Sequence, residues 1–425
     1  MSEFDKEQPS TWCVMPFSHI NIKHEGKLSA CWRFPDRIGD YTTETLTDAF
    51  NSERMRELRR ALLSGEKHIG CRSCWDLESA GVTSTRINCM KDYSKVITYE
   101  TAMQTLNKDD YTVPIEKMTS IEIRFDNICN LMCRHCSPDY SSKWENAVKK
   151  DNKLMDQMVS HGTYRKMQDH INLTDDLIDE IRTLAPHLQQ IMIAGGEPLY
   201  HDKHYRFLEN LQEHAKNIHL SYNSNLNTLE YKGKSILDLW KKFKGVDIRV
   251  SIDADPSIYE YVRVHSDLPK VENNIRTALM EMNNLLLSAT CTTSLLNITR
   301  LTDIFEYFNS LGVYVHTSLV QYPKALNPRL LPPELKNKVT ENWKSWSDDI
   351  EVNLKKTMTT SNSSRIDINT QIVRVKNYGN SIINYMNSED WYEENWKDFK
   401  SYITALDNYH KTNILDWYPE FKPYW

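Results

Sequence analysis

The sequence predicts an α/β fold: a partial (β/α)6 barrel, with a small cysteine-rich domain before it and a helical extension after it. Three features support this. Strand-like runs alternate with helical stretches through residues 118–322, four cysteines accompany a hairpin pattern in residues 1–90, and prolines and aromatics mark residues 323–425. Repeated β/α units build a parallel sheet with right-handed crossovers. The expected strands lie at residues 120–125, 189–194, 217–222, 246–252, 287–293 and 313–320.

The cysteine-rich domain is expected over residues 1–90. Residues 18–23 and 27–31 alternate in polarity on either side of a short turn, which is typical of a β-hairpin. Helical periodicity follows over residues 45–64. Residues 91–117 carry weak signals, and we interpret them as a linker to the barrel.

One barrel helix is predicted together with its cap. Thr174 suits the N-cap position, and acidic residues fill the first turn behind it. Leu177, Ile178, Ile181 and Leu184 then fall on one face at helical spacing. This face should pack against the sheet.

The extension over residues 323–425 begins with a group of prolines that break the β/α pattern. A polar run at residues 359–364 predicts an exposed loop. The end of the chain is rich in aromatic residues, which at helical spacing are usually core. We therefore expect helices that pack against the barrel.

Composition limits the function classes. The chain has 425 residues, a formal net charge of −6 and 26% charged residues, which argues against a general nucleic-acid surface. Its first residues lack the apolar core of a signal peptide, and no apolar run approaches the roughly 20 residues that span a bilayer. We expect a cytoplasmic protein without a membrane partner. Nine cysteines in a cytoplasmic chain favour metal or redox chemistry over disulfides.

Cys129, Cys133 and Cys136 form the most informative motif, spaced C-x-x-x-C-x-x-C directly after a predicted strand. Three thiolates can hold three corners of a cubane iron–sulfur cluster and leave one iron open to a small molecule. A zinc site with His135 as a fourth ligand is the alternative. The next predicted strand runs into Gly195-Gly196-Glu197-Pro198, which alone would be an ordinary turn.

In order and spacing, these two motifs resemble those of the radical S-adenosylmethionine (SAM) enzymes. The resemblance implies a TIM-like partial barrel whose [4Fe-4S] cluster binds SAM through its amino and carboxylate groups. Reductive cleavage would then yield methionine and a 5′-deoxyadenosyl radical, which takes hydrogen from a peptide or small-metabolite substrate. It also implies an electron donor of the flavodoxin or ferredoxin type. His135 stands in the aromatic slot of the motif, whose side chain packs near the adenine.

The same resemblance suggests further SAM-binding residues at the carboxyl ends of the strands, where sites in β/α folds gather. Asn225 belongs to a segment like the family's T-N-G, although Leu226 replaces the glycine. Ser251 starts an S-x-D segment, and Arg263 would pair with the SAM carboxylate unless it is an ordinary surface arginine. The predicted cofactor-binding residues are His135, Gly195, Gly196, Glu197, Asn225, Ser251 and Arg263.

The N-terminal cysteines resemble those of SPASM and twitch domains, which hold auxiliary clusters. Cys13, Gly26 and Cys31 match C-x(9–15)-G-x(4)-C, and Cys71 and Cys74 form a C-x-x-C. Only Cys89 could extend the pattern, so at most one auxiliary [4Fe-4S] cluster is expected, with zinc as the less favoured occupant. In better-known enzymes this domain follows the barrel, whereas here it precedes it.

Two other function classes stay open at this point. One is a zinc- or cluster-stabilised binding protein without catalysis, built on a degenerate barrel. The other is an electron-transfer protein with two clusters. Cys291 lies in a strand-like run, where a buried structural thiol is the expected role.

Overall fold

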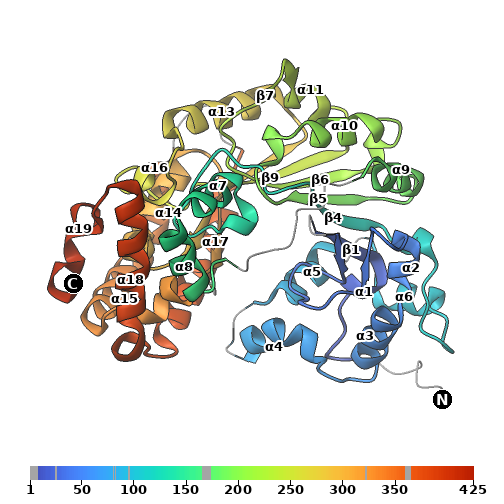
Figure 1. The fold of residues 1–425 in the computed structure, drawn as a ribbon, viewed down its shortest axis with the longest axis horizontal. Helices are drawn as coiled ribbons and strands as arrows, with labels where there is room; N and C mark the ends of the chain where they lie inside the picture. The colour runs from blue at the N-terminus through green and yellow to red at the C-terminus, as the bar shows by residue number, and fades with distance from the viewer. Residues whose placement is uncertain are drawn as a thin grey trace.

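The computed structural model describes residues 8–23, 26–79, 81, 83–93, 96–164, 174–320, 323–358 and 365–425. Its centre is a nine-stranded sheet in the order β11-β10-β9-β6-β5-β4-β1-β2-β3 (Figure 1). Six consecutive strands of this sheet, all paired in parallel with one another, form the predicted barrel. They are β4 (Ser120–Arg124), β5 (Gln190–Ala194), β6 (His219–Ser224), β9 (Gly245–Ser251), β10 (Leu285–Thr293) and β11 (Tyr314–Leu319). The predicted fold class is confirmed, and each strand begins and ends within two residues of its expected position.

The N-terminal hairpin continues the barrel sheet. β1 (His19–Ile22) pairs antiparallel with β2 (Lys27–Ser29), which pairs with β3 (Gly39–Asp40). β1 also pairs in parallel with β4, so that Asn21 lies beside Glu122. The cysteine-rich segment and the barrel, which the sequence separates, therefore share one sheet.

Helices of the N-terminal part differ from expectation at two places. The helix expected over residues 45–64 is divided at Asn51 and Ser52 into two, because Ser52 accepts a hydrogen bond from the Met55 amide and starts a new helix. The predicted linker also contains a helix, α6. The helices are α1 (Met15–Ser18), α2 (Leu46–Phe50), α3 (Glu53–Leu63), α4 (Arg72–Ser79), α5 (Thr85–Tyr93) and α6 (Tyr99–Thr105).

The barrel helices cover the outer face of the sheet (Figure 1). The capped helix is α9, in which the Leu177 amide donates to the Thr174 hydroxyl and all four predicted apolar residues are buried. The helices are α7 (Ser142–Lys150), α8 (Asn152–Ser160), α9 (Asp175–Leu184), α10 (Asp202–Asn210), α11 (Ile236–Trp240), α12 (Tyr259–Val262), α13 (Leu268–Glu281) and α14 (Leu301–Ser310). A small hairpin, β7 (Glu230–Tyr231) with β8 (Lys234–Ser235), stands apart from the main sheet.

The C-terminal extension is helical, as predicted. Its helix α17 packs along the edge strand β11, and α18 lies against α8 of the barrel. Aromatic residues such as Trp396, Phe399 and Tyr418 are buried there, while residues 359–364, expected as a loop, lie outside the described residues. The helices are α15 (Pro333–Asp348), α16 (Ile350–Thr357), α17 (Ile368–Asn387), α18 (Tyr392–His410) and α19 (Ile414–Trp417).

Short 3-10 helices complete the described chain. They are η1 (Ile69–Cys71), η2 (Ile115–Lys117), η3 (Pro138–Tyr140), η4 (Pro198–Tyr200), η5 (Ala215–Asn217), η6 (Ile298–Arg300), η7 (Lys324–Leu326), η8 (Pro328–Leu330) and η9 (Pro419–Tyr424). Among the residues described, none of the helices combines the length and the apolar character that a membrane crossing requires.

Candidate functional site

The cysteine triad lies on the loop that follows β4, at the carboxyl end of the parallel strands. Backbone hydrogen bonds attach this loop to the segment after α12: the Met132 amide donates to the Val264 carbonyl at 3.1 Å. The Trp144 indole nitrogen donates to the Cys133 carbonyl at 3.0 Å, which joins the loop to α7. The loop is therefore held from two sides.

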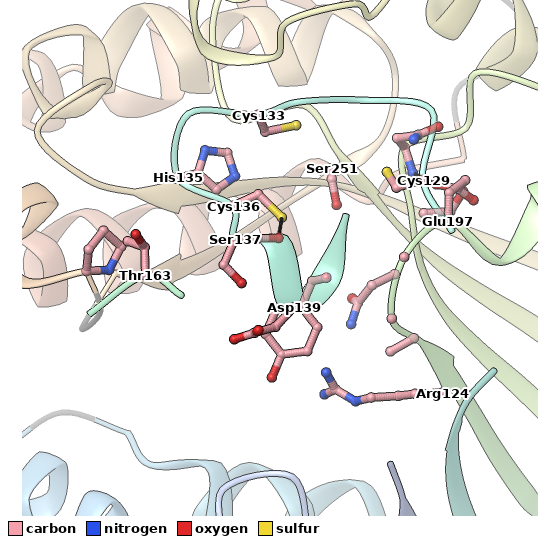
Figure 2. A pocket seen from close by; sticks show the side chains of 18 of the residues that line it. Arg124, Cys129, Cys133, His135, Cys136, Ser137, Asp139, Thr163, Glu197 and Ser251 are labelled. Atoms are coloured by element: carbon pink, nitrogen blue, oxygen red, sulfur yellow. Dashed lines mark hydrogen bonds between the residues drawn. The ribbon is translucent and has the colours of Figure 1, made fainter. Parts of the chain in front are cut away.

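All ten residues predicted for the SAM site line one cavity of about 900 Å³. Figure 2 shows the three cysteine side chains on its upper wall, with Glu197 at the end of β5 and Ser251 at the end of β9. The ten are Cys129, Cys133, His135, Cys136, Gly195, Gly196, Glu197, Asn225, Ser251 and Arg263. Residues from five separate segments of the chain thus meet at one place, although their individual roles stay predictions.

The two glycines are required by a close approach between loops. Gly195 and Gly196 have φ angles of 84° and 53°, which side chains rarely allow. A Cβ on Gly196 would stand 2.3 Å from the carbonyl oxygen of Ile128, on the triad loop. The Glu197 amide donates to the same oxygen at 2.7 Å. The turn after β5 therefore lies directly against the cysteine loop.

Glu197 is buried, and its carboxylate connects two strand ends. It accepts hydrogen bonds from the Ser224 hydroxyl at 2.8 Å, the Asn225 amide at 2.6 Å and the Leu199 amide at 3.2 Å. Burial raises the pKa of Glu197, and these hydrogen bonds oppose the rise. The side chain thus organises the cavity wall, while its contact with the SAM amino group stays a prediction.

Asn225 links the end of β6 to the triad loop, because its side-chain amide donates to the Asn130 side-chain oxygen at 2.7 Å. The following Leu226 is fully buried and has a φ of 51°. This is the position where the sequence departs from the family's glycine. The backbone keeps the left-handed conformation that glycine adopts most easily, at a cost of about 1–2 kcal/mol.

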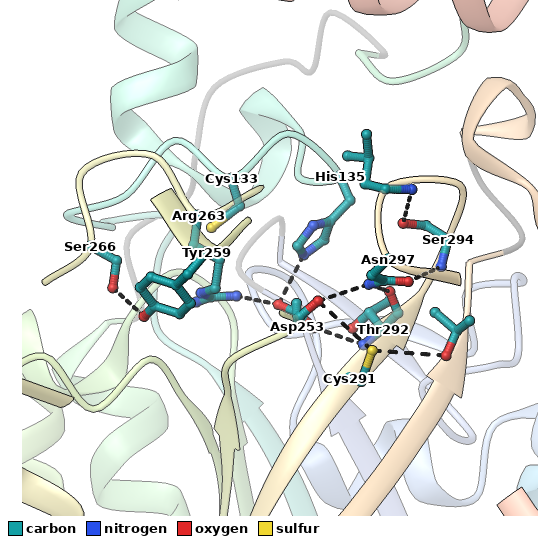
Figure 3. Close-up of polar contacts among 12 residues, drawn as sticks. Cys133, His135, Asp253, Tyr259, Arg263, Ser266, Cys291, Thr292, Ser294 and Asn297 are labelled. Carbon is teal, nitrogen blue, oxygen red and sulfur yellow. Dashed lines mark hydrogen bonds and ion pairs between the residues drawn. The ribbon is translucent and has the colours of Figure 1, made fainter. Parts of the chain in front are cut away.

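Arg263 and His135 both contact Asp253 (Figure 3). The Arg263 guanidinium lies 2.5 Å from Asp253 Oδ2, and His135 Nε2 lies 3.4 Å from the same atom. The Thr292 amide donates to Oδ1 at 2.7 Å. Arg263 is only 5% exposed, so the interpretation as a surface arginine is wrong.

The charges around Asp253 explain its electrostatics. Burial by itself would raise the pKa of this carboxyl, but the charges of His135 and Arg263 hold it well below its usual range. Burial would likewise lower the pKa of Arg263, and nearby Cys133 and Asp253 raise it instead. Asp253 is the last residue of the S-x-D segment, and its role was not predicted because a buried ion pair leaves no local signal in the sequence.

The donor set fits an iron–sulfur cluster. Burial, followed by the proximity of Cys133, raises the pKa of Cys129 to about 12, and burial raises that of Cys136 further. Among the described residues, no three His, Cys, Asp or Glu side chains stand close enough together to hold a single metal ion. A zinc ion, about 2.3 Å from each sulfur, needs such a compact group, whereas a cubane carries its irons at separate corners. Three thiols spread over a cavity wall suit the cluster.

The N-terminal cysteines form a second group, of which Cys13 and Cys74 are buried and Cys31 and Cys71 partly buried. Burial raises the pKa of the Cys13 thiol, and Cys31, Cys71 and Cys74 all contribute to that rise. Cys89, left unassigned by sequence, lies in the same place: burial raises the pKa of its thiol, and Cys13, Cys31 and Cys74 add to the effect. The structure thus brings the four predicted cysteines together and adds a fifth thiol.

The N-terminal part also contributes to the SAM cavity, through Lys27, Arg37 and Asp40. Arg124, at the end of β4, points into the same space (Figure 2). Its guanidinium donates twice to Oε1 of Glu122, at 2.8 and 3.1 Å. Sequence reasoning missed these residues, because only the pairing of β1 with β4 places the hairpin beside the barrel.

Family comparisons agree with this geometry. Residues 123–303 match the sequence model of the Radical SAM superfamily, and residues 13–75 match that of SPASM, an iron-sulfur cluster-binding domain. These matches support iron–sulfur clusters and SAM as the cofactors. No curated protein matches the chain.

Solved structures with a similar arrangement share little sequence. Native anSMEcpe with bound AdoMet is 15% identical, with a TM-score of 0.37, over 54% of this chain and 61% of its own. Streptococcus suis SuiB bound to S-adenosylmethionine is 12% identical, with a TM-score of 0.36, over 77% of this chain and 69% of its own. SuiB bound to precursor peptide SuiA is 10% identical, with a TM-score of 0.35, over 83% of this chain and 76% of its own.

The chain spans about three fifths of the length of the anSMEcpe structures that it matches. The family assignment depends on the two sequence matches and not on the solved structures. The SPASM match, residues 13–75, precedes the Radical SAM match, residues 123–303. Their order is the one that the cysteine motifs predicted. The chain belongs to the radical SAM superfamily and carries an iron–sulfur cluster-binding SPASM domain ahead of its barrel.

Proposed function

We propose that the protein is a radical SAM enzyme that acts on a peptide or a small metabolite with the help of one auxiliary [4Fe-4S] cluster. The observation that carries the proposal is the single cavity that gathers three cysteines, the glycine turn, Ser251 and Arg263. With both cofactors bound, one electron would break the C5′–S bond of SAM to give methionine and a 5′-deoxyadenosyl radical, which becomes 5′-deoxyadenosine by taking a substrate hydrogen atom.

The chain's own residues would bind and orient SAM. Gly195 and Gly196 let the backbone approach the SAM amino group, because no side chain intervenes. Arg263 offers a guanidinium that Asp253 fixes in place, suited to a carboxylate. His135, held by the same Asp253, would flank the adenine.

Substrate would enter the part of the cavity that faces the N-terminal domain. A volume of about 900 Å³ lies near the upper end for small-molecule pockets, so it leaves room beside SAM. The wall there is polar and charged, with Lys27, Arg124 and Asp139. This suits a peptide segment or a polar metabolite.

The N-terminal group would hold the auxiliary cluster through Cys13, Cys31, Cys71 and Cys74. Cys13 and Cys74 are buried, Cys31 and Cys71 are partly buried, and none of the four lines the SAM cavity. A flavodoxin- or ferredoxin-type protein would supply the electron that SAM cleavage consumes.

Anaerobic reconstitution followed by metal analysis tests the proposal. Two cubanes require about eight irons per chain, and the loaded protein should convert SAM to 5′-deoxyadenosine under dithionite. Cys136→Ala is the matched control and should form none. A fully loaded protein that yields no 5′-deoxyadenosine would refute the proposal, and bound zinc without iron would favour a non-catalytic binding protein.

Deuterium transfer then identifies the substrate class. Candidate peptides and metabolites, deuterated at carbon, are incubated with the loaded protein and SAM. A true substrate transfers deuterium into 5′-deoxyadenosine, whereas uncoupled SAM cleavage leaves it unlabelled.

A further inference from the structure

The C-terminal helix α18 contacts the triad loop directly, although neither family match extends to it. The contact is made through Arg134, which stands between Cys133 and Cys136 in the motif. Arg134 is fully buried, with 0% of its surface exposed. A buried guanidinium needs a compensating charge and hydrogen-bond acceptors.

Those partners come from two distant parts of the chain. Arg134 Nε donates to the Tyr261 carbonyl at 2.7 Å, and the guanidinium carbon lies 3.7 Å from the centre of the Tyr261 ring. Arg134 Nη2 donates to the Thr412 hydroxyl at 2.6 Å and lies 3.0 Å from Asp407 Oδ1. Asp407 therefore supplies the negative charge that the buried arginine requires.

Asp407 is itself held at the end of α18. Its Oδ1 accepts from the Thr412 hydroxyl at 2.7 Å and from the Tyr261 hydroxyl at 3.1 Å. Its Oδ2 accepts from the Ile414 amide at 2.7 Å. Lys411, with a φ of 56°, reverses the chain after the helix and so brings Thr412 and Ile414 back to the carboxylate.

The same helix also holds the backbone of Arg134. The Tyr402 hydroxyl donates to the Arg134 carbonyl at 3.0 Å, and Tyr402 is only 1% exposed. Asp407 and Tyr402 thus fix both the side chain and the peptide group of the residue that separates two of the cysteines. In a third contact, the ring of His410 packs against the ring of Trp144, whose indole nitrogen donates to the Cys133 carbonyl.

We propose that Asp407 and Tyr402 are positioning residues of the triad site, which hold Cys133 and Cys136 in place through Arg134. The C-terminal extension is then part of the cluster site instead of a covering for the barrel. This inference deepens the proposed function, because it concerns the same three cysteines. It does not depend on SAM cleavage, since it makes a claim about the thiols themselves.

Thiol reactivity in the full-length, metal-free chain provides the test. Each of the nine cysteines is followed by its rate of alkylation with iodoacetamide, read by peptide mass spectrometry. Tyr402→Phe removes one hydroxyl, and Asp407→Asn removes the charge with little change of shape. Because one hydrogen bond is lost, Cys133 and Cys136 should react roughly fivefold faster in Tyr402→Phe. Cys13 and Cys31 should keep their rates.

Two matched variants on the same helix serve as controls. Tyr409→Phe changes an exposed tyrosine, and Glu394→Gln neutralises an exposed carboxylate; both should leave every thiol rate unchanged. In the reconstituted protein, Tyr402→Phe should also alter the EPR spectrum of the triad cluster. If Asp407→Asn does not fold, Tyr402→Phe decides alone. If the alkylation rates of all cysteines rose equally, or if none rose, α18 would only pack against the triad loop without positioning its thiols, and the proposal would be overturned.

Discussion

The two cysteine groups differ in what they face. The triad cysteines line a cavity together with seven other predicted residues. The four predicted N-terminal cysteines, of which Cys31 and Cys71 are partly exposed, are not among the residues that line this cavity. The triad offers three thiols, and the N-terminal group offers four or five. An open site with too few protein ligands suits a reacting small molecule, and a closed site with enough of them suits electron transfer or stability.

The two groups nevertheless share one structural element. β1 and β4 lie side by side, and Glu122 on β4 accepts two hydrogen bonds from Arg124 at the cavity. Burial raises the pKa of Cys31, and the charge of Glu122 adds to that rise. An open and a closed site can therefore be built on one continuous sheet.

Removing one cysteine from each group should produce the largest contrast. Cys133→Ala should abolish formation of 5′-deoxyadenosine, while Cys13→Ser should retain SAM cleavage under dithionite, because only the triad faces the cavity. Iron content and 5′-deoxyadenosine, measured after reconstitution, check both. If Cys13→Ser also stopped cleavage at full occupancy of the triad, the division into an open and a closed site would be wrong.

Gly196→Ala should give the next largest effect. The new Cβ would stand 2.3 Å from the Ile128 carbonyl, so the turn after β5 has to move away from the triad loop. The matched control is Gly233→Ala, which also has a positive φ but meets no atom within 4 Å. Backbone conformation alone costs each variant about 1–2 kcal/mol. Urea unfolding should show a larger loss of unfolding free energy for Gly196→Ala than for Gly233→Ala. Calorimetry should show that only Gly196→Ala weakens SAM binding. The difference between the two variants measures the loop contact.

Glu122→Gln tests the element that joins the two groups. Glu122 is 1% exposed, so loss of its charge should lower the free energy of unfolding by about 1–3 kcal/mol. Glu209→Gln, which alters an exposed pair with Lys234, should change it by at most about 1 kcal/mol. Chemical denaturation of both variants gives the comparison. Equal losses would mean that Glu122 contributes no more than a surface carboxylate.

Asp253→Asn should have an effect that depends on pH. Because the folded state holds the pKa of Asp253 below its ordinary value of 3.8, the wild type gains stability above that value. The gain disappears as the pH falls below 3.8 toward the folded-state pKa. The stability difference between wild type and variant, measured by urea unfolding, should therefore be large at pH 7 and shrink in acid. A difference that stays constant with pH would contradict the ion pair.

Local sequence patterns were sufficient to predict the features that depend on residues close together in the sequence. The spacing of the triad, the glycines before Glu197 and the cap at Thr174 all act over a few residues, and all were predicted in place. The division of one expected helix at Ser52 was not predicted. The apolar periodicity continues across Ser52, and it hides the N-cap signal of a single serine.

Contacts across long separations were beyond sequence reasoning. Asp253 with Arg263, and Asp407 with Arg134, are buried ion pairs whose members show no pattern until the fold brings them together. Cys89 is similar, since its spacing matches no motif, yet α5 places it among the N-terminal thiols. In each case the free energy of burial, and not the local sequence, selects the partner.

The sequence by itself determined the parallel barrel, the cysteine motifs and therefore the superfamily, because strand periodicity and ligand spacing are written in short segments. Only the tertiary structure decided that the hairpin domain joins the barrel sheet and that the C-terminal helix reaches the triad loop. Pairing of strands and burial of charges depend on surfaces that come together after the chain has folded, so their outcome is visible only there.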